Sequence, residues 1–205
     1  MMHERPIVFV VDDDVSIREG LESLIRSAGW HVETFESARP FLSRARASGP
    51  SCLVLDVSLP DLSGLELQTA LADRVDLPII FITANGDVPM SVRAMKAGAV
   101  EFLTKPFNDD ALCDAIRYAL ERSEATLGSD TELRALRERY ASLSEREQAV
   151  MALVSSGLSN KQVGSELGIT EVTVKVHRGR VMRKMQADTF ADLVQMAGRL
   201  GMLPV

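Results

Sequence analysis

Five polar residues in the first half of the chain stand at the ends of short apolar runs. Asp12 and Asp13 follow IVFVV, Asp56 ends CLVLD, Thr83 ends LPIIFIT and Lys105 follows VEFLT. Carboxylate oxygens suit Mg²⁺, which bridges readily to phosphate oxygens. An aspartate beside a bound metal ion can attack a phosphoryl donor, while a hydroxyl and an ammonium group stabilise the developing charge. These residue types therefore predict phosphoryl transfer onto an aspartate.

The run of three aspartates, Asp12 to Asp14, is costly by itself because like charges held close together repel one another. A cation shared with Asp56 would offset that repulsion for the first two. Asp14 is expected to stay outside the site, in a solvated or helix-capping role. Ser16 and Glu19 have the spacing of a capping box, which predicts that the first helix is capped at Ser16.

Short strands that alternate with helices would bring the site residues together. Runs rich in β-branched and aromatic residues begin at Ile7, Trp30, Cys52, Leu77 and Val100, and segments of helical period separate them. This alternation predicts right-handed βαβ units and a parallel sheet covered by helices on both faces. If the first and third strands are neighbours, their carboxylates meet at the carboxyl edge, where open α/β sheets collect functional groups.

The composition changes after a helix that is predicted at about 109–122 and that ends the first domain, residues 1–122. Residues 123–140 are polar and charge-rich, and Gly128 and Ser129 break the helical pattern, which predicts a linker that is partly helical. Residues 141–205 have helical periodicity and no convincing strand, which is typical of a compact all-α domain. Its helices are predicted at 144–156, 160–167, 170–185 and 189–200.

A local concentration of positive charge marks the second domain. The formal net charge is −6, but within residues 170–185 five basic side chains stand against one acidic side chain. Two helices joined by a short turn, the second capped by Thr170, have the pattern of a helix-turn-helix. Val172, Val176 and Met182 are expected on its packed side. From charge alone, a solvated basic face on a helical bundle explains the pattern equally well. The residues that could supply charge to phosphates are Lys175, Arg178, Arg180, Arg183 and Lys184.

Other classes of protein are disfavoured by the composition. No apolar run approaches the roughly 18 to 20 residues needed to cross a bilayer, and the N-terminal segment becomes acidic too soon for a signal peptide. Cys52 and Cys113 have neither the spacing of metal ligands nor the density of a disulfide scaffold. We expect a soluble, cytoplasmic protein without a membrane partner, whose two thiols are reduced and structural.

The first domain resembles the receiver domain of two-component response regulators in the stretches VVDDD, LVLDVSLPDLSG, IIFITANGD and EFLTKPF. The resemblance covers about residues 5–122 and implies a flavodoxin-like (βα)5 fold. In that family the aspartate of the third strand accepts phosphate from a sensor histidine kinase, and Asp56 matches it. By the same resemblance Asp12 and Asp13 organise Mg²⁺ together with Asp56, and the backbone carbonyl of Ser58 completes the coordination.

The resemblance also assigns residues on the last two strands. Thr83 and Lys105 would contact the phosphoryl oxygens. Phe102 falls at the family's switch aromatic position, where a side chain repacks on phosphorylation. The peptide bond between Lys105 and Pro106 is one that the family usually holds cis. These assignments predict a phosphorylation switch that reaches from the phosphate to the face built from the fourth helix and the fifth strand.

A LuxR-type DNA-binding domain is similar to the stretch LSEREQAVMALVSSGLSNKQVGSELGITEVTVKVHRGRVMRKM. Together with the receiver this resembles the FixJ-like branch of response regulators and implies an all-α four-helix helix-turn-helix domain. Lys175, Val176 and His177 match the DNA-facing region of the recognition helix. Gly179 replaces a side chain that reaches DNA in many relatives, and lowers helix propensity by about 1 kcal/mol relative to Ala. The other DNA contacts are predicted at Thr170, Glu171, Thr173, Arg178, Arg180 and Lys184.

The two resemblances imply a phosphorylation-controlled transcriptional regulator rather than an enzyme. It would dimerise when phosphorylated, bind pseudo-palindromic double-stranded promoter DNA and act with RNA polymerase. One alternative is a Mg²⁺-dependent aspartyl-phosphate hydrolase, which typically needs a second acidic residue where this chain has Ser58. The other is a DNA-binding regulator whose receiver dimerises independently of phosphorylation, which would not need the complete set of site residues.

Overall fold

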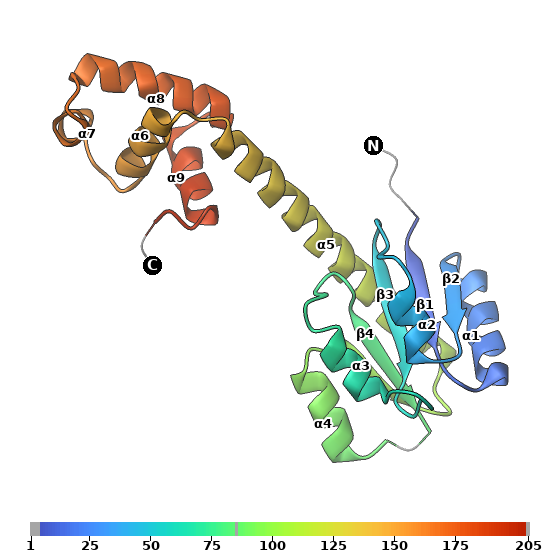
Figure 1. The fold of residues 1–205 in the computed structure, drawn as a ribbon. Coiled ribbons are helices and arrows are strands. Elements are labelled where there is room, and N and C mark those ends of the chain that lie inside the picture. Colours follow the sequence, from blue (N-terminus) through green and yellow to red (C-terminus); the bar gives the residue numbers. More distant parts are fainter. Residues whose placement is uncertain (1–4, 85, 204–205) are drawn as a thin grey trace. The chain divides into compact units, whose positions relative to one another are not determined.

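The computed structural model describes residues 5–84 and 86–203, and its first half is built around a five-stranded sheet (Figure 1). The strands are β1 (Ile7–Val11), β2 (His31–Phe35), β3 (Ser51–Asp56), β4 (Ile79–Thr83) and β5 (Glu101–Thr104). Their order across the sheet is β2-β1-β3-β4-β5, and each neighbouring pair runs parallel. The predicted flavodoxin-like arrangement, with the first and third strands adjacent, is confirmed.

Helices cover both faces of this sheet because successive strand side chains point to opposite sides. The helices are α1 (Val15–Ser27), α2 (Ala38–Ser43), α3 (Gly64–Ala70), α4 (Val88–Lys96) and the first turns of α5 (Asp109–Ala141). The face that carries Phe9 packs against α2, α3 and α4, and the face that carries Val10 packs against α1 and α5. Both faces are therefore apolar, and polar side chains are left to the ends of the strands.

Helix α5 is continuous through Gly128 and Ser129, where the sequence breaks the helical pattern, and it includes the whole of the predicted linker, residues 123–140. A glycine in a helix interior costs about 1 kcal/mol relative to Ala, and contacts on both sides offset this cost. Before the glycine, Ser123 is buried and bridges two backbone groups of the sheet unit. After it, Leu136 is buried in the second core. The chain nevertheless forms two compact units, which divide between Gly128 and Ser129.

The second unit is all-α. It contains the last turns of α5 and the helices α6 (Glu145–Ser155), α7 (Asn160–Leu167), α8 (Glu171–Met185) and α9 (Phe190–Arg199). Capping boxes start three of them, with Ser144 paired to Glu147, Ser159 to Gln162 and Thr189 to Asp192. Buried residues from all of these helices share one core. The expected helical helix-turn-helix domain is confirmed.

The start of α1 differs from the prediction. Asp14, not Ser16, is the N-cap, and its carboxylate accepts hydrogen bonds from the backbone N–H groups of Ser16 at 2.8 Å and Ile17 at 3.2 Å. Because Asp14 precedes Ser16 in the chain and its carboxylate binds the first unpaired N–H groups of the helix, Ser16 is not the N-cap and does not form a capping box with Glu19. The third aspartate of the acidic run therefore serves the helix.

The packed side of α8 also differs from the prediction. Val172 and Val176 are 70% and 50% exposed, whereas Val174 and Val181 are fully buried. Met182, the third residue expected on that side, does pack against the core. The prediction is wrong for Val172 and Val176. An apolar residue indicates the packed side of a helix only if the outer surface of that helix has no apolar residues, and α8 has two there.

Two further expectations concern membranes and thiols. Within the residues that the structure describes, no helix is both long and apolar enough to cross a membrane. Cys52 is buried, Cys113 is partly buried, and both are free cysteines. Burial raises the pKa of the Cys52 thiol, so this residue packs in the core as a neutral side chain.

Candidate functional site

An acidic cluster lies at the carboxyl edge of the sheet, where β1 and β3 end side by side. The pairing of Val11 with Leu55 places Asp12 and Asp56 at neighbouring strand ends, and Asp13 follows directly. Carboxylate oxygens of these three aspartates lie within 4.8 Å of one another. Asp12 and Asp56 are buried and Asp13 is exposed. The edge therefore holds two carboxylates away from water and one that is open to it.

Lys105 brings a positive charge to this cluster. Its Nζ lies 2.6 Å from Oδ2 of Asp12 and 3.5 Å from Oδ1 of Asp56. The backbone N–H of Lys105 donates to the carbonyl of Thr83 at 2.7 Å, which fixes the base of the side chain beside β4. The Lys105–Pro106 peptide bond is cis, as the resemblance predicted.

The charges of the cluster leave room for a further cation. Burial raises the pKa of Asp56, Lys105 opposes this effect, and the nearby Asp12 carboxylate adds to it. Oδ1 of Asp56 is buried and accepts no hydrogen bond from the described residues. A buried carboxylate oxygen normally has a partner. A divalent cation held by the three aspartates would supply one and offset their repulsion, so the residues present fit Mg²⁺.

Thr83 and Phe102 lie on neighbouring strands close to this edge. In the pairing of β4 with β5, Thr83 stands opposite Thr104 and Phe81 stands opposite Phe102. Thr83 is fully buried at the end of β4. The Phe102 ring is partly buried, with its centroid 6.1 Å from that of Phe81. Thr83 thus reaches the edge that holds the carboxylates, whereas Phe102 lies two residues before the end of β5, the outermost strand of the sheet.

Two residues that the sequence analysis missed support the acidic edge. Nη1 of Arg18, on α1, donates to the backbone carbonyl of Asp12 at 2.6 Å. Asp61, in the loop after β3, accepts from two backbone N–H groups at the start of α2, at 3.1 and 2.9 Å. This contact anchors the loop that carries Ser58, an exposed residue two positions beyond Asp56. An aspartate in a loop that faces a helix start could have signalled the second contact.

The same loop ends at Gly64, where the backbone passes close to the acidic edge. A Cβ atom at this position would overlap the carbonyl oxygen of Asp56 and lie 3.0 Å from Cα of Val57. Ser63 caps α3 in a capping box with Glu66. The segment can therefore turn sharply into α3 without moving the end of β3.

The outer surface of α8 is the second candidate site. Thr170 caps the helix by accepting a hydrogen bond from the backbone N–H of Thr173 at 3.2 Å, and Glu171 forms an ion pair with Lys175 at 3.2 Å. The Cβ position of Gly179 has open space around it. The predicted contact residues that are exposed on this helix are Thr170, Glu171, Lys175, Val176, Arg180 and Lys184.

Two predicted DNA-contact residues are turned partly toward other helices. Nδ1 of His177 is buried and has no hydrogen-bond partner among the described residues. Nη1 of Arg178 donates to Oδ1 of Asn160, at the start of α7, at 3.3 Å. The same guanidinium lies over the ring of Phe190, 4.5 Å from its centroid. Arg178 thus connects α8 to the first turns of α7 and α9.

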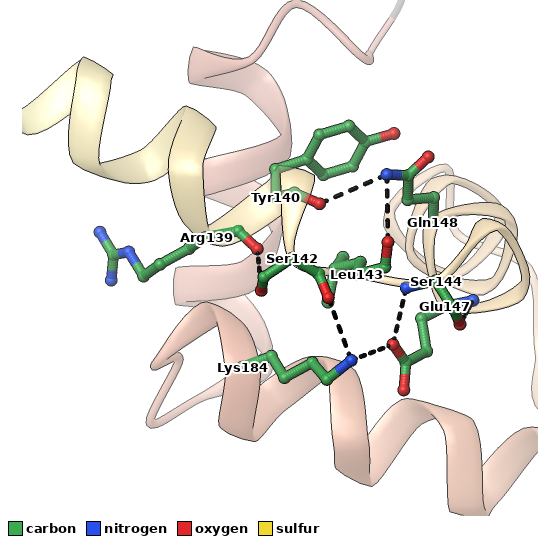
Figure 2. Close-up of polar contacts among 8 residues, drawn as sticks. All are labelled: Arg139, Tyr140, Ser142, Leu143, Ser144, Glu147, Gln148 and Lys184. Carbon is green, nitrogen blue, oxygen red and sulfur yellow. Dashed lines mark hydrogen bonds and ion pairs between the residues drawn. The ribbon is translucent and has the colours of Figure 1, made fainter.

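Lys184 is engaged inside the domain as well (Figure 2). Its Nζ lies 2.7 Å from Oε2 of Glu147, a carboxylate that also accepts from the backbone N–H of Ser144 at 2.9 Å. Glu147 is only 3% exposed. The hydrogen bonds from Lys184 and Ser144 lower the pKa of Glu147 to about 2. Lys184 therefore faces an ionised carboxylate at neutral pH.

A flavodoxin-like sheet with aspartates and a lysine at its carboxyl edge, followed by a helix-turn-helix, defines a regulator that couples phosphorylation to DNA binding. Family comparison agrees with this class. Residues 8–117 match the response regulator receiver domain, and residues 141–197 match the luxR family of bacterial regulatory proteins. The chain belongs to the response regulators that join a receiver to a LuxR-type DNA-binding domain.

Individual relatives cover nearly the whole chain. Nodulation protein W of Bradyrhizobium diazoefficiens is 52% identical over 96% of this chain and 87% of its own length. Transcriptional regulatory protein FixJ of the same species is 42% identical over 96% of each chain. The solved structure of the response regulator StyR has a TM-score of 0.84 and 50% identity, and covers 96% of this chain and 100% of its own. The predicted FixJ-like branch is confirmed, and the chain is a phosphorylation-controlled transcription regulator.

Proposed function

We propose that Asp56 accepts a phosphoryl group from the phosphorylated histidine of a sensor kinase. A carboxylate oxygen of Asp56 attacks phosphorus, the P–N bond breaks, and its electron pair stays on the imidazole nitrogen. The observation that carries this proposal is the buried Oδ1 of Asp56, which accepts no hydrogen bond from the described residues and lies 3.5 Å from the ammonium of Lys105. This oxygen has a positive charge beside it and lone pairs that can attack phosphorus.

The residues around Asp56 have separate roles. The carboxylates of Asp12, Asp13 and Asp56 and the backbone carbonyl of Ser58 would hold Mg²⁺, which would neutralise charge on the phosphoryl oxygens. Asp12 also keeps the ammonium of Lys105 in place through their 2.6 Å contact, and Lys105 then binds a phosphoryl oxygen.

Phosphorylation acts on the rest of the receiver through two switch residues. The hydroxyl of Thr83 binds the phosphoryl group and moves toward it. Phe102 repacks into the space that this movement changes, which alters the surface formed by α4 and β5. Two phosphorylated copies then pair through that surface as a homodimer.

The dimer presents two copies of α8 to double-stranded promoter DNA in the cytoplasm, where the bound dimer works with RNA polymerase. Each α8 lies in the major groove of one half-site. Basic side chains contact phosphates, and side chains near the start of the helix reach base edges. The contacts come from the exposed residues Thr170, Glu171, Lys175, Val176 and Arg180, with Thr173, His177 and Arg178 beside them.

The phosphoacceptor assignment is tested by incubating the full chain with Mg²⁺ and a small phosphodonor. We expect base-labile, acid-stable phosphate on the wild type and a loss of at least about 100-fold in Asp56→Asn, since the amide is no nucleophile toward phosphorus. Asp73→Asn, an exposed aspartate outside the cluster, is the matched control and should be labelled like the wild type.

Labelling of Asp56→Asn at the wild-type level would reject the assignment. Labelling that is independent of Mg²⁺ would reject the metal site but leave the phosphoacceptor in place. Rapid turnover of a phosphate ester would favour a hydrolase. Binding to promoter DNA and the oligomeric state, measured on the same samples, test whether the phosphate controls dimerisation.

A further inference from the structure

The C-terminal ends of α5 and α8 meet in the second unit, and each receives a cation from the other. Nζ of Lys184, in the last turn of α8, donates to the carbonyl of Ser142, just after the last turn of α5, at 3.1 Å (Figure 2). In return, Nη1 of Arg139, in the last turn of α5, donates to the carbonyl of Met185 at 2.9 Å. The same Nη1 lies 3.2 Å from Oε1 of Gln186, which ends α8 in a left-handed conformation.

This reciprocal arrangement satisfies groups that a helix cannot satisfy alone. The last carbonyl groups of a helix have no partner within it, and they carry the negative end of the helix dipole. A lysine or arginine placed there forms a charge-assisted hydrogen bond. Because each cation belongs to the other helix, the two ends are fixed relative to one another as well as capped.

The first turn of α6 is tied to the same place. Glu147 accepts from Lys184, and it also accepts from the backbone N–H of Ser144, the N-cap of α6 (Figure 2). Nε2 of Gln148 lies 3.4 Å from the carbonyl oxygens of both Tyr140 and Leu143. Lys184 therefore joins three helices, since it contacts the end of α5 and the start of α6 from the end of α8.

We propose that Arg139 and Lys184 are positioning residues for DNA recognition, which hold α8 in its reading orientation without contacting DNA themselves. The inference rests on the proposed role of α8 as the helix that enters the major groove. It revises one part of that role, because Lys184 was predicted from its charge to contact a phosphate. The phosphate contacts near the end of α8 are left to Arg180 and Arg183, which are exposed and line the same surface as Glu147 and Lys184.

The energetic reason lies in the burial of Glu147. A phosphate contact that drew Lys184 away would leave unpaired a carboxylate that is 3% exposed and whose one ion pair among the described residues is with Lys184. Leaving a buried charge unpaired is more costly than a typical surface contact with phosphate can offset. Lys184 therefore stays in the domain when DNA binds.

The test compares binding of the full chain to two duplexes of equal length over a series of salt concentrations. One duplex is selected from a random pool by the wild type in the presence of Mg²⁺ and a phosphodonor, and the other has an unrelated sequence. Arg139→Met and Lys184→Met keep most of the aliphatic stem and remove the charge. Arg137→Met and Arg183→Met are matched controls, exposed and close to each test residue in sequence.

A loss of orientation has a signature that a loss of charge does not share. For Arg139→Met and Lys184→Met we expect affinity for the selected duplex to fall about tenfold, the equivalent of one charge-assisted hydrogen bond. Affinity for the unrelated duplex and the salt dependence of binding should stay at the wild-type values. Arg183→Met should weaken both duplexes and lower the salt slope by about 0.9 for each protomer, or about 1.8 for the dimer, and Arg137→Met should change neither.

Three outcomes would overturn the proposal. Lys184→Met could lower the salt slope as Arg183→Met does, which would make Lys184 a phosphate contact. Selected-duplex affinity within twofold of the wild type would remove any positioning role. An equal loss of affinity for both duplexes, with a smaller fraction of protein able to bind DNA, would mean that the residues serve folding alone. Thermal unfolding and a stoichiometric titration with DNA identify this case.

Lys184→Arg keeps a donor for Glu147 and Ser142 and should retain affinity for the selected duplex. This variant keeps the proposal testable if Lys184→Met fails to fold. A wild-type chain that selects no sequence at all would reject the proposed function itself, whatever the variants do.

Discussion

At the scale of the residue, buried charge is the common feature of both units. Asp12 and Asp56 share the ammonium of Lys105 at the edge of the sheet, and Glu147 faces Lys184 in the helical unit. In each place a carboxylate with little access to water relies on one cation from a distant part of the sequence. Removal of either cation should therefore lower the free energy of unfolding, because a buried carboxylate is left without its partner.

Lys105→Met should destabilise the receiver by about 2 kcal/mol, because two buried carboxylates lose their shared cation. Mg²⁺ should recover part of this loss, and its stabilising effect should be larger in the variant than in the wild type. Urea unfolding, followed by the fluorescence of Trp30 with and without MgCl₂, measures both effects, since the chain contains one tryptophan. Lys96→Met, an exposed lysine on α4, is the control. A variant as stable as the wild type, or indifferent to Mg²⁺, would contradict the shared-cation reading.

The helical unit should lose stability in acid through Glu147. Its pKa is lowered from 4.5 to about 2, so the ionised carboxylate contributes stability that is complete above pH 4.5 and disappears as the pH falls toward 2. Glu147→Gln should cost about 1 to 2 kcal/mol at neutral pH and should remove this part of the acid dependence.

Unfolding followed by far-ultraviolet circular dichroism across that pH range compares Glu147→Gln with the wild type. Glu145→Gln, an exposed residue in the same helical turn, should keep the wild-type profile. Parallel pH profiles for the wild type and Glu147→Gln would show that this carboxylate is not the source of the acid sensitivity.

At the scale of the element, periodicity and strand-end chemistry predict most of the molecule. The strand order was implied by the family resemblance, and with β1 beside β3 the meeting of Asp12 with Asp56 follows from the rule that parallel strands place their carboxyl ends together. The continuity of α5 did not follow, because contacts at Ser123 and Leu136 override the local preference of Gly128 and Ser129. Local sequence also hid the ion pair of Lys184, whose partner lies 37 positions away.

Two glycines offer a matched test of how backbone position sets the effect of a methyl group. Gly179→Ala should stabilise α8 by up to about 1 kcal/mol, since a Cβ there meets open space and the helix gains propensity. Gly64→Ala should destabilise the receiver by more than about 1 kcal/mol, since its Cβ would overlap the carbonyl of Asp56. Chemical unfolding of the full chain measures both changes. A stabilised Gly64→Ala would mean that the loop after β3 moves freely.

At the scale of the whole molecule, the two units have separate cores and share one helix. Leu112 and Ile116 of α5 are buried in the receiver, and Leu136 of the same helix is buried in the helical unit. The formal charge of −6 conceals a difference between an acidic receiver and a recognition helix rich in basic residues. Residue types at the strand ends predicted phosphoryl transfer, whereas DNA binding was predicted only with the resemblance to LuxR-type domains, and the point at which one unit passes into the other depended on packing.

Ser123 has a practical consequence for anyone who exchanges output domains between regulators of this kind. Its hydroxyl donates to the carbonyl of Asp76 at 2.6 Å and accepts from the backbone N–H of Ser51 at 3.0 Å, so it bridges two segments at the edge of the sheet opposite the aspartates. At the other end, Glu132 pairs with Arg199 of α9 at 3.1 Å. A fusion junction placed before residue 123, where the sequence becomes polar, would separate Ser123 from the receiver with which it forms these hydrogen bonds. Chimeras should instead keep Ser123 with the receiver and everything from Glu132 onward with the DNA-binding module.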